Sequence, residues 1–320
     1  MTPQSVNLTE SLNGEPTPQL DPLEVFVCVL TALTVVLILT LNPICLVVLH
    51  RASGIQETTK VSMASLTVSD ICVGLLWVLP QLTQEFNGEW VLGSFLCTAW
   101  GVLFPLPAGL GVLSLVLLTV DRFVAIVYSL RYPTLMTLKK AKIIVAITWS
   151  LALAFSIIVC GILLPRAISP VEPRTCVLKS SAYKFYNGII VVIFAISLLT
   201  IVILYLYILK VARQQARRIA AQNQINVDRG DRRAPQRVST KSATTVFIIT
   251  ITVCICWTPL ILQRATYSIV EELQSFKFHL ITNLIFFTNS WLNVVIYYLR
   301  NRELRQALHE LLASCFRRRF

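Results

Sequence analysis

Long uninterrupted runs of apolar residues dominate the chain, and most charged residues lie between them. Seven runs are long enough to cross about 30 Å of hydrocarbon as helices of roughly 20 residues. They cover residues 25–49, 61–83, 96–127, 142–164, 185–209, 244–269 and 279–299. Because the runs are continuously apolar and do not alternate with a period of two, they predict helices and not a β-barrel. The pattern therefore predicts an all-α membrane protein, a bundle of seven transmembrane helices.

The two ends of the chain have different patterns. Residues 1–24 form a polar tail, residues 25–299 hold the bundle, and residues 300–320 form a C-terminal segment. In that segment apolar residues recur at helical spacing, opposite Arg and Glu. They are Leu304, Leu308, Leu311, Leu312 and Cys315. This spacing predicts an amphipathic helix on the inner membrane leaflet, with the Arg residues at 317–319 near anionic lipid.

Composition and charge support a membrane location and predict its orientation. Of the 320 residues, 55% are hydrophobic and 14% charged, whereas charged residues supply about a quarter of a soluble domain. The net charge of +12 does not indicate nucleic-acid binding, because Lys and Arg gather in alternate connections and not on one face. These connections follow spans one, three, five and seven, so we expect those ends to be cytoplasmic. The acidic N-terminal tail, with no Lys or Arg, is expected outside the plasma membrane.

Cysteines and one sequon agree with this orientation. Cys97 at the outer start of the third span and Cys176 between spans four and five face the oxidising side, so we expect them to form a disulfide. Cys315 is expected in the cytoplasm, either palmitoylated or as a free thiol. The other cysteines lie within spans, where a free thiol is a small hydrophobe; they are Cys28, Cys45, Cys72, Cys160, Cys254 and Cys256. Asn7 begins an Asn-Leu-Thr glycosylation sequon, a triplet that also occurs by chance.

Two charged residues, Asp121 and Arg122, stand side by side at the cytoplasmic end of the third span. From Cys97 to this pair a helix would extend about 36 Å, roughly one membrane thickness. One interpretation is an interfacial Arg that reaches water beside a neighbouring carboxylate. Motifs on the other spans favour a functional pair.

These motifs resemble those of the class A, rhodopsin-like G-protein-coupled receptors, in the amine and adenosine-type branch, over nearly the whole chain. Asp121-Arg122-Phe123 resembles the family's Asp-Arg-Tyr triplet. The other matching segments are SLTVSD ending at Asp70, Trp90 with Gly93 and Cys97, Trp149, CWTP from Cys256 to Pro259, and NSWLNVVIY from Asn289 to Tyr297. Each motif is weak alone, but their order and sidedness on seven spans make the resemblance specific.

The resemblance implies a switch that acts on heterotrimeric G proteins. In the family, the Arg that matches Arg122 is held by its neighbouring carboxylate at rest and reaches the cytoplasmic opening when helix six moves outward. Pro259 removes a backbone hydrogen bond and gives helix six a hinge at Trp257. The implied switch residues are Asp121, Arg122, Tyr205, Tyr297, Asn293, Trp257 and Pro259. Tyr205 has a second interpretation, as an interfacial aromatic residue.

An acid within a membrane span is expensive, so Asp70 is a candidate functional residue, and it is the only clear one in mid-membrane. The resemblance places Asn42, Asn289, Ser290 and Asn293 around it. In relatives such a cluster binds a sodium ion. Gly111 stands here where the third helix usually offers Ser, so the cluster holds either sodium or water.

Four positions depart from the family's transmission residues. Val253 replaces an aromatic residue below Trp257, Ser197 replaces the Pro of helix five, and Val294 replaces the Pro of helix seven. Ser239 stands where many relatives carry an acid that restrains the Arg. We therefore expect measurable ligand-independent activity.

The pocket implied by the resemblance is mainly apolar with a few polar groups. It consists of Phe104, Ala108, Phe194, Trp257, Leu260, Ile261, Arg264, Asn283 and Phe287, with Gln263 nearby. Phe104 replaces the Asp that pairs with amine ligands, and Phe287 replaces the Lys that binds retinal, so no retinal is expected. Arg264 would meet an anionic ligand group or pair with Glu271 or Glu272. Pro105 and Pro107 are expected to distort the outer third of helix three.

These features predict a G-protein-coupled receptor for an extracellular small molecule or peptide whose identity the sequence does not give. The first alternative is a receptor-like partner protein that does not couple to G proteins. A transporter is less favoured, because it would require more intramembrane charges and broken helices in two halves. No catalytic or metal-binding constellation is visible, so we expect no enzymatic activity. Membrane lipid and a G protein are the expected partners, and sodium is the one candidate ion.

Overall fold

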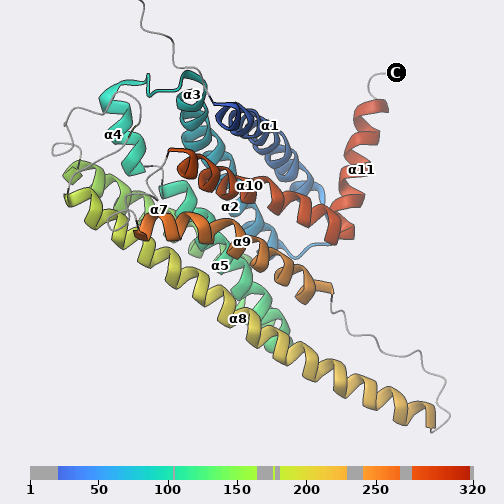
Figure 1. The fold of residues 1–320 in the computed structure, drawn as a ribbon. Coiled ribbons are helices and arrows are strands. Elements are labelled where there is room, and N and C mark those ends of the chain that lie inside the picture. Colours follow the sequence, from blue (N-terminus) through green and yellow to red (C-terminus); the bar gives the residue numbers. More distant parts are fainter. Residues whose placement is uncertain are drawn as a thin grey trace, which may run out of the picture.

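The computed structural model describes residues 21–103, 105–163, 176, 181–228, 241–266 and 276–317. Within these ranges, seven helical spans are long and apolar enough to cross a membrane, and they form one bundle (Figure 1). This confirms the predicted all-α, seven-helix fold. The N-terminal tail with Asn7, most of the loop before Cys176, Ser239, Glu271 and Glu272 lie outside the described residues.

The first two spans are α1 (Pro22–Arg51) and the pair α2 (Glu57–Val73) and α3 (Leu79–Asn87). A single π-helical turn, Gly74–Val78, joins α2 to α3. Pro80 follows at once, and the wider turn accommodates the backbone hydrogen bond that proline cannot make. A Cβ on Gly74 would lie 2.7 Å from Ile38 Cγ2, so only glycine allows α1 to approach this closely.

The third span consists of α4 (Gly93–Leu103) and α5 (Pro105–Val127), on either side of residue 104, which is not described. A short helix α6 (Tyr132–Leu135) follows, then α7 (Leu138–Leu163). Trp149 Nε1 donates to Ser65 Oγ at 2.9 Å, and Ser65 Oγ lies 2.8 Å from Ser114 Oγ. These side chains connect α2, α5 and α7 inside the bundle.

The remaining helices are α8 (Ser181–Asp228), α9 (Lys241–Thr266), α10 (Phe276–Arg300) and α11 (Arg302–Arg317). Figure 1 shows α8 running along one side of the bundle and continuing well beyond it. Apolar side chains such as Leu151, Ile158 and Leu199 are exposed on the outer faces of α7 and α8. Lipid would cover these faces, because water would not stabilise so much exposed apolar surface.

Helix α11 leaves the end of α10 at a steep angle (Figure 1). Asn301 Oδ1 caps its start by accepting from Glu303 N at 2.9 Å. Leu304 is fully buried against the bundle, and Leu308 and Leu311 pack beside it, whereas Leu312 is exposed. The predicted amphipathic helix is therefore present. Cys315 lies in α11, but its side chain is outside the described residues.

Candidate functional site

The pair Asp121–Arg122 lies at the inner end of the bundle, the end predicted to be cytoplasmic. Asp121 is fully buried, and its carboxylate pairs with Arg122 Nη2 at 2.8 Å. The same carboxylate accepts hydrogen bonds from Thr59 Oγ1 at 2.8 Å and Tyr132 Oη at 2.6 Å. Arg122 also donates to the Thr59 hydroxyl and, at 3.5 Å, to Gln56 Oε1. The pair thus joins α2, α5 and α6.

Tyr132 and Thr59 were not singled out from the sequence. Burial, and then the hydrogen bond to Asp121, raise the pKa of Tyr132, so its hydroxyl remains a donor at neutral pH. Tyr132 Oη also lies 2.6 Å from Thr58 Oγ1. The only sequence signal was a tyrosine 11 positions after an acid, which is too common to carry a prediction.

The two tyrosines that the resemblance implies as switch residues, Tyr205 and Tyr297, are both buried. The ring of Tyr205 stacks on Phe247 of α9, with centroids 5.1 Å apart. Tyr297 Oη is buried and has no hydrogen-bond partner among the described residues. In this conformation the stacking packs α8 against α9.

A polar cluster surrounds Asp70 in the middle of the bundle. Asn293 Nδ2 donates to Asp70 Oδ2 at 3.3 Å, and Asn42 Nδ2 donates to the Ser290 backbone oxygen at 3.1 Å. Asn289 is also buried, so all five predicted members are shielded from solvent. The side-chain oxygens of Asn42, Asn289 and Asn293 have no hydrogen-bond partner among the described residues. A carboxylate with several unpartnered amide oxygens fits a hard cation or ordered water.

The four departures have structural consequences at three described positions. Ser197 Oγ donates to the Ile193 backbone oxygen at 2.8 Å, inside the continuous helix α8. Val294 is buried within α10, which is also continuous there. Val253 is buried beside a small void of about 10 Å³ between α5, α8 and α9. The valine leaves unfilled part of the space that a larger aromatic ring would take.

A narrow cavity lies between the π-helical turn Gly74–Val78, α8 and α9, toward the outer end of the bundle. It has about 30 Å³ of free volume, room for about two water molecules. Its lining includes Phe194, Trp257, Leu260, Ile261 and Arg264 from the sequence-derived pocket, together with Trp77, Tyr186, Asn187, Ile190 and Val191. Phe194 and Trp257 meet edge to face at 4.9 Å. A ligand of ordinary size would therefore require these side chains to move apart.

Other members of the sequence-derived pocket lie elsewhere. Phe287 is fully buried against Trp77, with ring centroids 5.3 Å apart. Asn283 hydrogen-bonds toward Gln81 of α3, and Ala108 is buried in α5. Phe104 is outside the described residues. Trp77, which lines the cavity, was missed because its residue type in an apolar run is indistinguishable from a core position.

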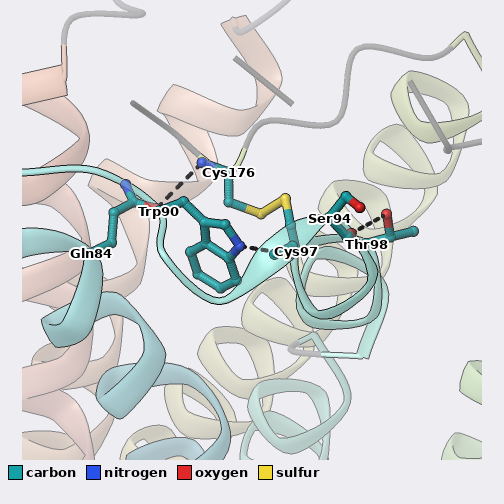
Figure 2. Close-up of a disulfide and its surroundings, with 7 residues drawn as sticks. Gln84, Trp90, Ser94, Cys97, Thr98 and Cys176 are labelled. Atoms are coloured by element: carbon teal, nitrogen blue, oxygen red, sulfur yellow. Dashed lines mark hydrogen bonds between the residues drawn. A yellow bond between two sulfur atoms is a disulfide. The ribbon is translucent and has the colours of Figure 1, made fainter. Parts of the chain in front are cut away.

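The outer end is closed by a disulfide between Cys97 and Cys176, which confirms the predicted pairing (Figure 2). The backbone N–H of Cys176 donates to Gln84 Oε1 of α3 at 3.4 Å. Trp90 Nε1 donates to the Gly93 backbone oxygen at 2.9 Å, and Gly93 has a positive φ of 79° that favours glycine. The disulfide and these bonds tie the outer loops to α3 and α4 above the cavity.

Seven spans, a buried Asp-Arg pair at one end, and a small cavity and a disulfide toward the other are features of a membrane receptor of the seven-helix class. Comparison with known proteins agrees: the family described as 7 transmembrane receptor (rhodopsin family) matches residues 41–297. The chain belongs to this family.

Individual relatives are distant. The chain is 27% identical to the alpha-1D adrenergic receptor of Rattus norvegicus, over 83% of this chain and 53% of that receptor. It is 26% identical to the octopamine receptor beta-2R of Chilo suppressalis (90% and 80%) and 25% identical to the neuromedin-U receptor 2 of Mus musculus (93% and 78%). It thus spans about half the length of the adrenergic relative.

Proposed function

We propose that this protein is a plasma-membrane receptor that activates heterotrimeric G proteins in response to an extracellular ligand, with its N-terminus outside the cell. The buried network of Asp121, Arg122, Thr59 and Tyr132 carries this proposal. It holds a cationic side chain at the inner end of the bundle, where outward movement of α9 would let Arg122 contact a docked partner. Family membership and the alternating placement of basic residues support it.

The coupling mechanism follows from two packing arrangements of the same helices. Trp257 contacts Phe194 of α8 and Phe286 of α10 on the cavity side, at 4.9 and 4.8 Å between ring centroids. A ligand that separates these rings would act on α9 around Pro259 and weaken the stacking of Phe247 on Tyr205. The proposal includes palmitoylation of Cys315 and glycosylation of Asn7. It does not include retinal as a ligand.

Replacement of Arg122 by Ala tests the proposal. Purified full-length protein in lipid vesicles is expected to accelerate nucleotide exchange on at least one class of heterotrimeric G protein without added ligand. The Arg122→Ala form is expected to lose at least tenfold of that rate, because it lacks the guanidinium that contacts the partner. Exchange is measured with a non-hydrolysable GTP analogue. Arg305→Ala, which removes another inner basic residue that caps α10, should keep most of the activity.

Exchange no faster with native protein than with empty vesicles, for every G-protein class, would contradict the proposal of ligand-independent coupling. It would favour the receptor-like partner protein as the alternative function.

The cluster around Asp70 is part of the same proposal, as a site for a sodium ion that favours the resting state. The Asp70 carboxylate would supply the charge, and Asn42, Asn289 and Asn293 would supply neutral oxygens. Gly111 provides no side-chain oxygen; a Cβ there would lie 3.3 Å from Ser69 Oγ. The site would therefore depend on the amide oxygens more than in relatives with a third-helix Ser.

Exchange of sodium for a bulky organic cation tests this site. At tenfold excess over its dissociation constant, sodium would stabilise the folded protein by about 1.4 kcal/mol, so we expect the melting temperature to be about 3 °C higher in sodium chloride than in N-methylglucamine chloride. Asp70→Asn should abolish the difference. Asp21→Asn, which removes an exposed acid, should preserve it. Equal melting temperatures of native protein in the two salts would show that water fills the cluster.

A further inference from the structure

Glu85 is a second buried acid, and the sequence-based end of its span at residue 83 excluded it. The structure extends this span through α3 to Asn87, and Glu85 in its last turn is only 3% exposed. No Lys or Arg in the described part of the chain forms an ion pair with it. A buried acid without a cationic partner is costly and marks a candidate functional site.

Glu85 ends a chain of hydrogen bonds that starts on α10. Gln81 Nε2 donates to Glu85 Oε1 at 3.2 Å, and Asn283 Nδ2 donates to Gln81 Oε1 at 3.5 Å. Asn283 Nδ2 also lies 2.9 Å from His279 Nε2. A carboxylate only accepts hydrogen bonds, so Gln81 must turn its nitrogen toward Glu85 and its oxygen toward Asn283. The charge of Glu85 therefore determines the orientation of both amides.

This orientation leaves two buried acceptors without partners, one on each side of the Gln81 amide. Glu85 Oε2 and Asn283 Oδ1 are buried and have no hydrogen-bond partner in the described structure. The amide nitrogens of Gln81 and Asn283 are directed along the chain of hydrogen bonds and do not reach either oxygen. The Thr31 hydroxyl of α1 lies beside Glu85 and is buried as well. Unpartnered acceptors around a carboxylate call for a positively charged donor.

Trp77 lies on the same span as Gln81 and Glu85 and connects this span to the cavity. Trp77 lies four residues before Gln81 and eight before Glu85, so the three side chains follow one face of the same span. Trp77 contacts Phe286 and Phe287 at 4.6 and 5.3 Å between centroids, and it lines the cavity next to Trp257. An aromatic or aliphatic part of a ligand bound beside Trp77 would contact Phe286, which in turn contacts Trp257.

We propose that Glu85 binds the primary ammonium group of an extracellular ligand, with Asn283 accepting a second N–H and an apolar ligand body against Trp77. A primary ammonium has three donors, and Glu85 Oε2, Asn283 Oδ1 and Thr31 Oγ1 are buried oxygens without a partner among the described residues. A metal ion fits less well, because no three His, Cys, Asp or Glu groups gather anywhere in the described residues. The counter-ion thus lies on the second span and not at Phe104 of the third. This inference rests on the proposed function, since it identifies the ligand class of that receptor.

The probe is 2-phenylethylamine, and 2-phenylethanol is its uncharged counterpart. Purified full-length protein is expected to melt several degrees higher with millimolar phenylethylamine and to show no change with phenylethanol. Glu85→Gln keeps an acceptor for Gln81 and the side-chain volume, so it should fold, but its affinity for phenylethylamine is expected to be roughly thirtyfold weaker. Glu89→Gln removes the same charge from an exposed outer position and should bind like the native protein.

Three results would overturn the inference: no shift of the native protein with phenylethylamine, an equal shift with phenylethanol, or an undiminished shift in Glu85→Gln. The first would leave Glu85 as a neutral buried acid in a structural network. Because no G protein is present in this assay, its failure is separate from failure of coupling. Amine binding together with absent nucleotide exchange would retain the site and reject the signalling proposal.

Discussion

Replacement of both Cys97 and Cys176 by Ser is expected to lower the melting temperature of the purified protein by on the order of 10 °C. The disulfide joins residues separated by 79 positions, a loop whose closure corresponds to about 4 kcal/mol in the unfolded chain. Membrane insertion already restricts this loop, so that value is an upper limit. Thermal unfolding followed by size-exclusion chromatography measures the change.

The matched control is Cys254→Ser, because Cys254 is a free, half-buried thiol in α9. It should shift the melting temperature by no more than a few degrees. A double variant as stable as this control would mean that the hydrogen bonds of Gln84 and Trp90 hold the outer loop without the covalent link. The first structural consequence expected in the double variant is separation of the loop from α4, which carries Cys97.

Asp121→Ala is expected to destabilise the protein about as much as loss of the disulfide does. Its effect on nucleotide exchange is expected to be opposite to that of Arg122→Ala. Removal of the carboxylate leaves Arg122, Thr59 and Tyr132 without their acceptor, and removal of one partner from a buried ion pair costs about 3–5 kcal/mol. The freed Arg122 should raise ligand-independent nucleotide exchange several-fold in the protein that remains folded. Melting temperature and exchange are measured on the same preparation.

Glu57→Ala provides the comparison for this change. Glu57 pairs with Lys60 at 2.7 Å but is 62% exposed, and such surface pairs contribute about 0–1 kcal/mol. It removes the same charge from the same end of the bundle. If Asp121→Ala lowers the melting temperature no more than Glu57→Ala, the buried network does not hold the inner end together. If Asp121→Ala does not raise nucleotide exchange above that of Glu57→Ala, Asp121 does not restrain Arg122.

The seven spans could be predicted because each satisfies its own backbone and presents apolar side chains to lipid. Their ends were less certain, since interior burial and not hydropathy sets them. The second span illustrates this. The apolar run predicts an end at residue 83, whereas α3 continues to Asn87 because Gln81, Gln84 and Glu85 are all buried. Polar residues in a last turn look like loop residues until their partners are known.

The candidate sites divide in the same way. Asp70, Asp121 and Arg122 were identifiable because charged residues are rare at such positions. Tyr132 and Glu85 were not, since a tyrosine in a polar connection and a glutamate near a helix end are ordinary. Thr59 became part of the inner network only because α2 passes beside the end of α5. The partner of each polar group was decided by helix packing.

The sequence by itself determined the number and order of the spans, the distribution of charge, and the pairing of Cys97 with Cys176. These properties follow from composition within each segment, because the membrane imposes the same length and polarity on every crossing. Tertiary structure alone decided which oxygens around Asp70 lack partners and that Glu85 is shielded from water. It also decided that Trp77 lines the outer cavity. Those facts depend on side chains brought together from segments far apart in the chain, which no local pattern encodes.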